Sequence, residues 1–356
     1  MKTTKQIKVG NVLIGGNAPI SIQSMTNTKT SDMEATIAQI RSLSDAGCQI
    51  IRCAVPDEES ANAIKVIKQN INIPLVADIH YDYRLALLSI ENGADKIRIN
   101  PGNIGAESAV KEVVCEAKKA GIPIRIGVNG GSLEKDLLEK YRGPTPVALV
   151  ESALRNIKLV EKMNFKDIIV SIKTSDVKAN FDAHKLLSTY TNHPLHIGIT
   201  EAGSGPRALV KSSIGIGSLL LMGIGDTIRV SLTGDPVSEI NAAKDILSSI
   251  GLKKGTINVI SCPTCGRTEV DLPTIASKIN ERLTELEQKH IKEGKPSITV
   301  AIMGCSVNGP GEARSSDFGV ACGKGKGVLF KRGQILKTVD EVDIVDELMT
   351  LISDQI

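Results

Sequence analysis

Short runs of β-branched residues recur along roughly the first 250 residues of the chain and alternate with longer amphipathic stretches. The runs occupy residues 21–26, 50–55, 75–80, 96–100, 123–129, 167–173, 195–200 and 226–232. Successive runs lie roughly 20 to 40 residues apart, which suits strand–helix units better than hairpins. Eight such units over about 250 residues favour a closed parallel (β/α)8 barrel of the TIM type, with a doubly wound open sheet as the alternative.

The alternation ends near Gly251, and a different pattern follows. Residues 271–290 have the periodicity of one amphipathic helix, residues 297–303 form a strand-like run, and a glycine-rich turn comes next. A chain of 356 residues also exceeds the size at which one hydrophobic core usually stops growing. We therefore expect a barrel at residues 1–252 and a smaller α/β (α+β) domain at residues 253–356.

Composition excludes several classes of partner. Aromatic residues make up 2% of the chain and Trp is absent, which argues against a surface that stacks nucleic-acid bases, and a net charge of +3 is too small to indicate a polyanion. We find no apolar run long enough for a membrane span and no secretory leader, so we expect a cytoplasmic protein. In that reducing compartment, seven cysteines are thiols or metal ligands sooner than disulfides.

Polar and charged residues stand at the ends of the predicted barrel strands. Residues two apart on a strand share a face, so Arg98 and Asn100 lie together at the carboxyl end of theirs. The other residues at or near such strand ends are Arg52, Asp78, His80, Arg125, Asn129, Lys173, Thr200, Glu201, Arg229 and Ser231. Barrel enzymes assemble their active sites at this end, so we expect these side chains to form one site.

The charges in this group do not balance. Five of its members are cationic, whereas Asp78 and Glu201 are its evident carboxylates. Charges removed from water are costly unless they are paired, and arginine matches phosphate oxygens well. The alternative is that each arginine only forms a salt bridge in the scaffold. Five cations on separate strands favour an anionic ligand, and a phosphorylated or diphosphate substrate fits best.

The remaining histidines and several cysteines suggest no chemistry. His184 and His290 fall in helical segments, and we expect both on the surface. We expect Cys48, Cys53 and Cys115 to be small buried apolar groups.

Three cysteines in the second domain have the spacing of metal ligands. Cys262 and Cys265 form a C-x-x-C knuckle, and Cys305 follows a strand in a glycine-rich turn. A redox dithiol needs no third cysteine, and structural zinc requires a fourth Cys or His nearby. The nearest oxygen ligand is Glu312, seven residues after Cys305. Three thiolates and one weaker ligand favour an iron–sulfur cluster over zinc, although spacing alone leaves both open.

Several long motifs occur in an order that resembles one known family. They are "ADIHYDYRLAL", "KIRINPGNIG", "RIGVNGGSL", "GITEAGS", "CPTCGR" and "GCSVNGPGE". Together they resemble the (E)-4-hydroxy-3-methylbut-2-enyl diphosphate synthases of the non-mevalonate isoprenoid pathway, over essentially the whole chain. The resemblance implies a TIM-like barrel followed by a 4Fe-4S domain, in a homodimer in which the cluster of one subunit covers the barrel mouth of the other.

The resemblance also implies a reaction and roles for individual residues. The reaction is the two-electron reductive ring opening and dehydration of 2-C-methyl-D-erythritol 2,4-cyclodiphosphate. The cluster ligands correspond to Cys262, Cys265, Cys305 and, as a displaceable fourth ligand, Glu312. The substrate-binding positions correspond to Arg52, Asp78, His80, Arg98, Asn100, Arg125, Asn129, Lys173, Thr200, Arg229 and Ser231. Glu201 corresponds to a proton donor, and Cys322 lies outside the ligand motif.

The electrons for such a reaction must come from a partner. No G-x-G-x-x-G motif follows a predicted strand, which argues against a nicotinamide or flavin bound by this chain. The resemblance implies a flavodoxin or ferredoxin, and a basic group of Lys324, Lys326, Lys331 and Arg332 is a candidate contact for an acidic donor. The alternative function is a barrel lyase or transferase that acts on a phosphorylated substrate and carries a structural zinc domain.

Overall fold

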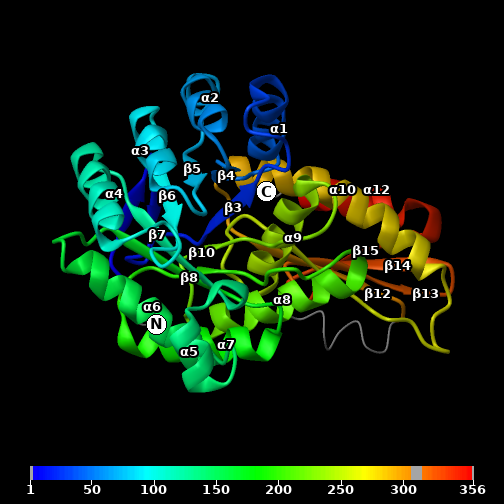
Figure 1. The fold of residues 1–356 in the computed structure, drawn as a ribbon. Helices are drawn as coiled ribbons and strands as arrows, with labels where there is room; N and C mark the ends of the chain where they lie inside the picture. Colours follow the sequence, from blue (N-terminus) through cyan, green and yellow to red (C-terminus); the bar gives the residue numbers. More distant parts are fainter. Residues whose placement is uncertain (1–2, 306–314, 355–356) are drawn as a thin grey trace. The chain divides into compact units, whose positions relative to one another are not determined.

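The computed structural model describes residues 3–305 and 315–354, which form two compact units, residues 1–250 and 251–356. Unit 1 is built around eight parallel strands (Figure 1). They are β3 (Ser21–Met25), β4 (Ile50–Ala54), β5 (Leu75–Asp78), β6 (Lys96–Ile99), β7 (Ile124–Asn129), β8 (Ile168–Lys173), β9 (His196–Ile197) and β10 (Thr227–Ile228). The sheet order is β8-β7-β6-β5-β4-β3-β10-β9, and a parallel bridge between Val170 and Leu195 joins its two ends. The predicted TIM-like barrel is therefore confirmed, and the open-sheet alternative is wrong.

Helices follow the strands and surround them (Figure 1). They are α1 (Met33–Asp45), α2 (Glu58–Gln69), α3 (Tyr83–Glu91), α4 (Glu107–Ala120), α5 (Lys135–Tyr141), α6 (Pro146–Glu161), α7 (Val177–Tyr190), α8 (Gly205–Leu221) and α9 (Pro236–Ser249). Aspartates begin several of them. Asp57 accepts a hydrogen bond from the backbone N–H of Ser60, and Asp176 accepts one from Ala179. These caps satisfy backbone donors at the βα turns and fix where each helix leaves its strand.

A small hairpin closes the amino end of the barrel. Its strands, β1 (Ile7–Val9) and β2 (Val12–Ile14), pair antiparallel. Their buried side chains cluster with apolar side chains from the first residues of three barrel strands. The cluster consists of Ile7, Val9, Ile14, Ile50, Val76 and Ile169. This end of the barrel is dry and apolar, so polar side chains farther along the strands face the opposite end.

In its described residues, unit 2 contains a five-stranded mixed sheet and the helices α10 and α12. Its elements are β11 (Ile257–Ser261), α10 (Leu272–Lys292), β12 (Ile298–Met303), β13 (Phe318–Gly323), β14 (Lys326–Lys331), β15 (Gln334–Asp340), a short 3-10 turn η3 (Glu341–Asp343) and α12 (Ile344–Ser353). Strands β11, β12 and β13 are parallel, and β13, β14 and β15 are antiparallel. Ile275, Ile279 and Leu283 recur every four residues on α10 and pack into the core that covers one face of the sheet.

Strand β13 packs closely against its neighbours in the sheet of unit 2. Gly319 on β13 has no room for a side chain, because an added Cβ would lie 2.6 Å from the carbonyl oxygen of Ala301 and 2.3 Å from the ring of Phe330.

None of the helices among the described residues is long and apolar enough to cross a membrane.

Candidate functional site

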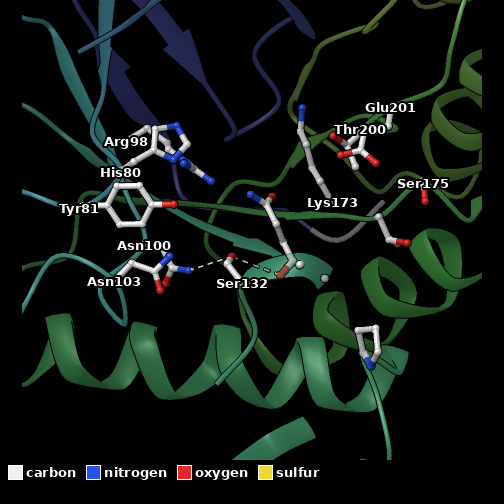
Figure 2. Close-up of a pocket in the computed structure, with 15 residues that line it drawn as sticks. His80, Tyr81, Arg98, Asn100, Asn103, Ser132, Lys173, Ser175, Thr200 and Glu201 are labelled. Carbon is white, nitrogen blue, oxygen red and sulfur yellow. Dashed lines mark hydrogen bonds between the residues drawn. The ribbon is translucent and has the colours of Figure 1, made fainter. Parts of the chain in front are cut away.

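Two adjoining cavities lie at the carboxyl end of the barrel strands, and we call them together the barrel mouth. The deeper cavity has a volume of about 180 Å³ and the outer one about 520 Å³. The deeper one is lined by Met25, Arg52, Asp78, His80, Arg98, Arg125, Asn129, Ser171, Lys173, Thr200, Arg229 and Ser231. Figure 2 shows the outer cavity, with Arg98 and His80 on one side and Lys173, Thr200 and Glu201 on the other. Each substrate-binding residue expected from the sequence lines one cavity or both.

Asp78 is the centre of an ion-pair network in the mouth. It ends β5 and is 2% exposed. Its Oδ1 lies 3.3 Å from Nη1 of Arg98, and its Oδ2 lies 3.9 Å from Nε of Arg52 and 3.2 Å from Nε2 of His80. Burial by itself raises the pKa of the carboxyl group, but the surrounding cations and His80 outweigh this effect and hold the pKa well below its usual range. Asp78 is therefore a carboxylate, and it orients two arginines at once.

Several guanidinium N–H groups in the mouth have no hydrogen-bond acceptor in the protein. Arg125 is buried, and its Nε and Nη1 have no hydrogen-bond acceptor; Nε of Arg98 and of Arg229 are in the same position. Burial and the neighbouring cations Arg52 and Arg98 lower the pKa of Arg125 well below its usual value. Buried N–H groups without acceptors carry a free-energy cost that an anionic ligand would remove. The mouth is therefore built to receive oxygen atoms that carry negative charge.

Lys173 ends β8 and reaches the same cavity. Its Nζ lies close to β9, where a Cβ added to Gly198 would be 3.3 Å from it and 2.4 Å from the carbonyl oxygen of Arg229. Glycine at this position lets the lysine and the neighbouring strand approach each other. Burial, together with Arg229 and the other arginines, lowers the pKa of Lys173 well below its usual value.

Two asparagines stand at the ends of β6 and β7. Asn100 donates from Nδ2 to Oγ of Ser132 at 3.3 Å and accepts at Oδ1 from the N–H of Gly102 at 3.2 Å (Figure 2). With its amide oriented to satisfy its neighbours, Asn129 accepts from Nη2 of Arg98 at 3.1 Å and donates to the carbonyl of Val128 at 3.2 Å. Both amides are therefore held in fixed orientations at the rim.

Glu201 lies on the rim of the mouth and is exposed. Its φ angle of 54° places a non-glycine residue in the left-handed region. Such a backbone is strained and is found most often at functional sites. The residue is followed by the start of α8 at Gly205, and Thr200 before it lines both cavities. The geometry holds the carboxyl group of Glu201 beside the cavity and open to water.

The expected cysteine ligands lie at the carboxyl ends of two adjacent parallel strands. Ser261 at the end of β11 is in register with Ile302 of β12, and the N–H of Cys262 continues this pairing by donating to the carbonyl of Ile302 at 3.0 Å. Cys305 comes two residues after the end of β12. The two segments thus begin side by side.

A tight turn carries the second cysteine of the knuckle. Thr264 has a φ of 69°, and the Cys265 N–H donates to Oγ1 of Thr268 at 3.2 Å. The same Thr268 lies against Gly304, where an added Cβ would be 3.1 Å from its Oγ1. The turn therefore packs against the residue that precedes Cys305.

Cys262, Cys265 and Cys305 together have the donor chemistry of a metal-binding set. Within the described residues, no three Cys, His, Asp or Glu side chains are gathered closely enough to form a metal site. The backbone nevertheless brings the segments of Cys262, Cys265 and Cys305 together, and thiolates are the usual protein ligands of iron–sulfur clusters. The set fits such a cluster, with the expected fourth ligand, Glu312, outside the described residues.

Some site residues were missed by the sequence analysis. Glu239 on α9 is a further carboxylate that faces the cations: its Oε1 lies 3.4 Å from Nη2 of Arg229, and its Oε2 accepts from Oγ of Ser24 at 3.0 Å. Lys96 was also missed, although it is a further basic residue inside the barrel and is fully buried. Its position two residues before Arg98 was the signal that could have found it.

Three expectations about other residues were wrong. His184 and His290 are buried, not on the surface; His184 Nδ1 lies 2.8 Å from the carbonyl oxygen of Asn180 on α7, a local contact that satisfies part of the ring inside the protein. Cys115 is exposed, whereas Cys48 and Cys53 are buried as expected. The four basic residues of unit 2 do not form one patch: Lys324 and Lys326 lie at one end of the six-residue strand β14, and Lys331 and Arg332 lie at the other.

Comparison with known proteins adds independent findings. The family profile "GcpE TIM-barrel domain" matches residues 4–244, and "GcpE protein C-terminal domain" matches residues 258–354. The chain is 58% identical to the 4-hydroxy-3-methylbut-2-en-1-yl diphosphate synthase (flavodoxin) of Caldanaerobacter subterraneus subsp. tengcongensis, over 98% of this chain and 96% of that protein. It is 56% identical to the enzyme of the same description from Clostridium perfringens, over 99% of this chain and 98% of that protein.

Solved structures resemble this chain in the barrel. Dihydropteroate synthase from Stenotrophomonas maltophilia matches with a TM-score of 0.51 and 12% identity, over 69% of this chain and 98% of that one. The N-acetylneuraminic acid synthetase of Leptospira borgpetersenii matches with a TM-score of 0.50 and 13% identity, over 79% of this chain and 97% of that one. At such low identities the likeness supports the barrel fold alone.

Proposed function

Because the chain belongs to the GcpE family of 4-hydroxy-3-methylbut-2-en-1-yl diphosphate synthases, we propose that its barrel mouth binds the cyclic diphosphate substrate of this enzyme. The reaction is the reductive ring opening and dehydration of 2-C-methyl-D-erythritol 2,4-cyclodiphosphate to (E)-4-hydroxy-3-methylbut-2-enyl diphosphate, and it uses a 4Fe-4S cluster. The observation that carries the assignment of the mouth is its excess of buried cations over carboxylates, with guanidinium N–H groups that lack acceptors.

The proposed clamp divides into three kinds of contact. Arg52, Arg98, Arg125, Lys173 and Arg229 offset the phosphate charge. Asp78 orients Arg98 and Arg52, while Asn100, Asn129, Thr200, Ser231 and His80 supply neutral hydrogen bonds around the carbon skeleton. Preorganised donors of this kind align a substrate without reorganisation during the reaction, and this lowers the barrier.

The overall reaction balances with two electrons and one proton. Each phosphate of the cyclic substrate carries one negative charge, and ring opening leaves a linear diphosphate with a third charge. The hydroxyl group that departs takes up the proton and leaves as water. We assign the delivery of this proton to Glu201, whose carboxyl group stands at the rim, open to water and beside the cavity.

The cluster is assigned to unit 2. Cys262, Cys265, Cys305 and Glu312 would hold it. When bound, a 4Fe-4S cluster supplies single electrons and an iron that accepts an oxygen ligand. We propose that the two domains expected from the sequence have separate roles. Residues 1–252 bind the substrate, and residues 253–356 carry the cluster.

The function is tested by anaerobic purification and assay. We expect a brown protein that contains iron and acid-labile sulfide and that converts the cyclodiphosphate to the linear product when a reduced flavodoxin is supplied. Phosphorus NMR distinguishes the two diphosphates. A colourless protein that contains zinc and no sulfide would instead support the barrel lyase or transferase with a structural zinc domain.

The electron donor and location are proposals of finer detail. The relatives' names specify flavodoxin, and we propose flavodoxin or ferredoxin as the donor to this chain. Because the basic residues of β14 are divided between its two ends, we assign no docking surface to them. We propose a cytoplasmic location, since reduced thiols and an oxygen-sensitive cluster both require a reducing compartment.

We further propose that the enzyme is a homodimer, and the surface of α8 supports this. Val210, Ile214 and Leu221 are 56%, 56% and 72% exposed. Their spacing of four and seven residues places them on one face of the helix, and Met222 extends this apolar stripe. A second copy of the chain can bury the stripe against its own, because a twofold axis pairs identical surfaces.

Replacing Ile214 with Glu should convert the dimer to a monomer, because the dimer would have to bury a charge at an apolar contact. Sedimentation velocity at micromolar concentration measures the change. The control is Val147→Glu, which alters another exposed apolar side chain, on α6, and should leave the dimer intact. If the cluster of one subunit serves the barrel of the other, the Ile214 variant keeps its iron and loses at least about tenfold in activity. A dimer that persists in the Ile214 variant would contradict the assignment of this surface.

A further inference from the structure

Lys96 lies inside the barrel, one step below the mouth. It precedes Arg98 by two residues on β6, so the two side chains share a face of the strand. The side chain is fully buried, and its Nζ donates a 3.4 Å hydrogen bond to Oε1 of Gln23. No carboxylate of the described residues forms an ion pair with it. The nearest acidic neighbour in sequence, Asp95, is bound instead to Lys68 at 2.5 Å and to the Leu75 N–H at 2.7 Å.

The charged groups around Lys96 are mostly cationic. Of these groups, Arg125 on β7 and Arg52 on β4 act on it with the same sign, Asp95 just before β6 opposes them, and the buried His196 on β9 lies within its electrostatic reach. Arg98 shares its face of the strand, while Asp78, Lys173 and Arg229 line the mouth. Burial is the largest influence and lowers the pKa of Lys96 well below its usual value; Arg125 and Arg52 lower it further, and Asp95 opposes them only in part. An ammonium group is therefore poorly accommodated here while no anion is present.

The ligand proposed for the mouth changes this balance. The cyclic diphosphate brings two negative charges, and its ring opening adds a third. One two-residue step along a strand is roughly 7 Å, and at an effective dielectric of about 20 each negative charge at that distance strengthens proton binding about fiftyfold. The arginines stay charged throughout, so the groups that can respond are the two buried lysines with lowered pKa values, Lys96 beneath the mouth and Lys173 in it.

We propose that Lys96 is uncharged while the barrel mouth is empty and binds a proton when the diphosphate is present, so that ligand binding is coupled to proton uptake by the protein. Lys96 thereby adds a positive charge beneath the clamp once the ligand is bound. Ring opening adds a third negative charge and strengthens proton binding at Lys96 further. The second half of this inference rests on the proposed function, whereas the uncharged state of the empty enzyme does not.

The uncharged state is tested first, without any ligand, through the pH dependence of stability. The usual pKa of lysine is about 10.4, so below that pH the unfolded chain binds a proton that folded Lys96 lacks, and the stability of the wild-type protein rises with pH. Lys96→Met keeps the buried stem and removes the part of this dependence that Lys96 contributes. We expect the variant to melt at a higher temperature at pH 7.5 and this advantage to shrink towards pH 9.5, by up to about tenfold in the unfolding equilibrium constant for each pH unit.

The control for this measurement is His196→Gln, at another fully buried titratable group, on the barrel strand β9. Burial lowers the pKa of His196 well below its usual value, so that group is already neutral throughout this pH range and its replacement should give no slope. A difference between wild type and Lys96→Met that does not change with pH would show that Lys96 is charged in the empty enzyme, and it would overturn the proposal.

Proton uptake is then measured by titration calorimetry with the cyclodiphosphate in Hepes, Tris and Pipes, without reductant so that no turnover occurs. The substrate itself does not titrate near neutral pH, so protons taken up bind to the protein. We expect the wild type to take up about one proton per site. Proton uptake by Lys96→Met should be smaller than this by at least about half a proton. Equal uptake by both proteins would overturn the coupling. If no binding heat appears at all, the assignment of the ligand fails while the melting experiment still decides the state of Lys96.

Discussion

Replacing Cys305 with Ala is expected to give a protein without its cluster and without activity. Without Cys305 only the two thiolates of one turn and the displaceable carboxylate of Glu312 remain, and this set is too weak to hold a four-iron cluster. Iron and acid-labile sulfide should fall to background in anaerobically purified protein, and turnover should fall by at least about a thousandfold. The control is Cys322→Ala. Cys322 is fully buried in the core of unit 2, where burial raises the pKa of its thiol to about 12, so its loss should leave the cluster in place.

Glu312→Ala should separate cluster binding from turnover. A carboxylate is a weaker ligand for iron than a thiolate, so the three cysteines are expected to retain the cluster without it. Iron and sulfide should stay near wild-type content while activity is lost. The electron paramagnetic resonance spectrum of the reduced variant should no longer respond to added substrate as that of the wild type does. If Glu312→Ala and Cys305→Ala lose metal equally, Glu312 is no more displaceable than the sulfurs.

Replacing Arg98 with Met should be the most damaging single change in the barrel mouth. Arg98 is 6% exposed and is held between Asp78 and Asn129. Methionine fills the space of the stem but supplies no charge and no N–H group, and it leaves the buried carboxylate of Asp78 with weaker compensation. We expect kcat/KM to fall at least about a hundredfold, that is ~2.7 kcal/mol, with most of the loss in KM.

Two controls make this result specific. Arg84→Met removes an exposed arginine that pairs with Asp82 at 2.7 Å at the start of α3 and lines neither cavity, and it should change kcat/KM by less than about twofold. Arg98→Lys keeps the charge and loses the planar fork, so it should fall between Arg98→Met and the wild type. An Arg98→Met enzyme with an unchanged KM for the cyclodiphosphate would remove Arg98 from the proposed clamp.

The sequence predicts the barrel well because its signals are local and repeated. Each strand is a short β-branched run, and each helix has an amphipathic period and often an aspartate cap. The site was predicted in part for the same reason: Arg98 and Asn100 are two residues apart, and strand geometry places both at the carboxyl end. The need for an anion followed from counting cations against acids at these positions.

What the sequence could not predict depends on contacts between distant segments. Glu239 faces Arg229 and Ser24 from the first turn of α9, and nothing in the local pattern distinguishes it from a solvent-facing acid at a helix start. His184 was expected on the surface because its neighbours are polar, whereas the packing of α7 buries it. Lys96 was overlooked because lysine is rarely buried without a partner, and this rarity is what makes it informative.

The hairpin of β1 and β2 determines by which route substrate and product reach and leave the site. Its apolar side chains occupy the amino end of the barrel, so a diphosphate has no hydrated path in that direction. The substrate must therefore enter, and the product leave, through the barrel mouth. A bound product therefore competes directly with the next substrate molecule for the barrel mouth.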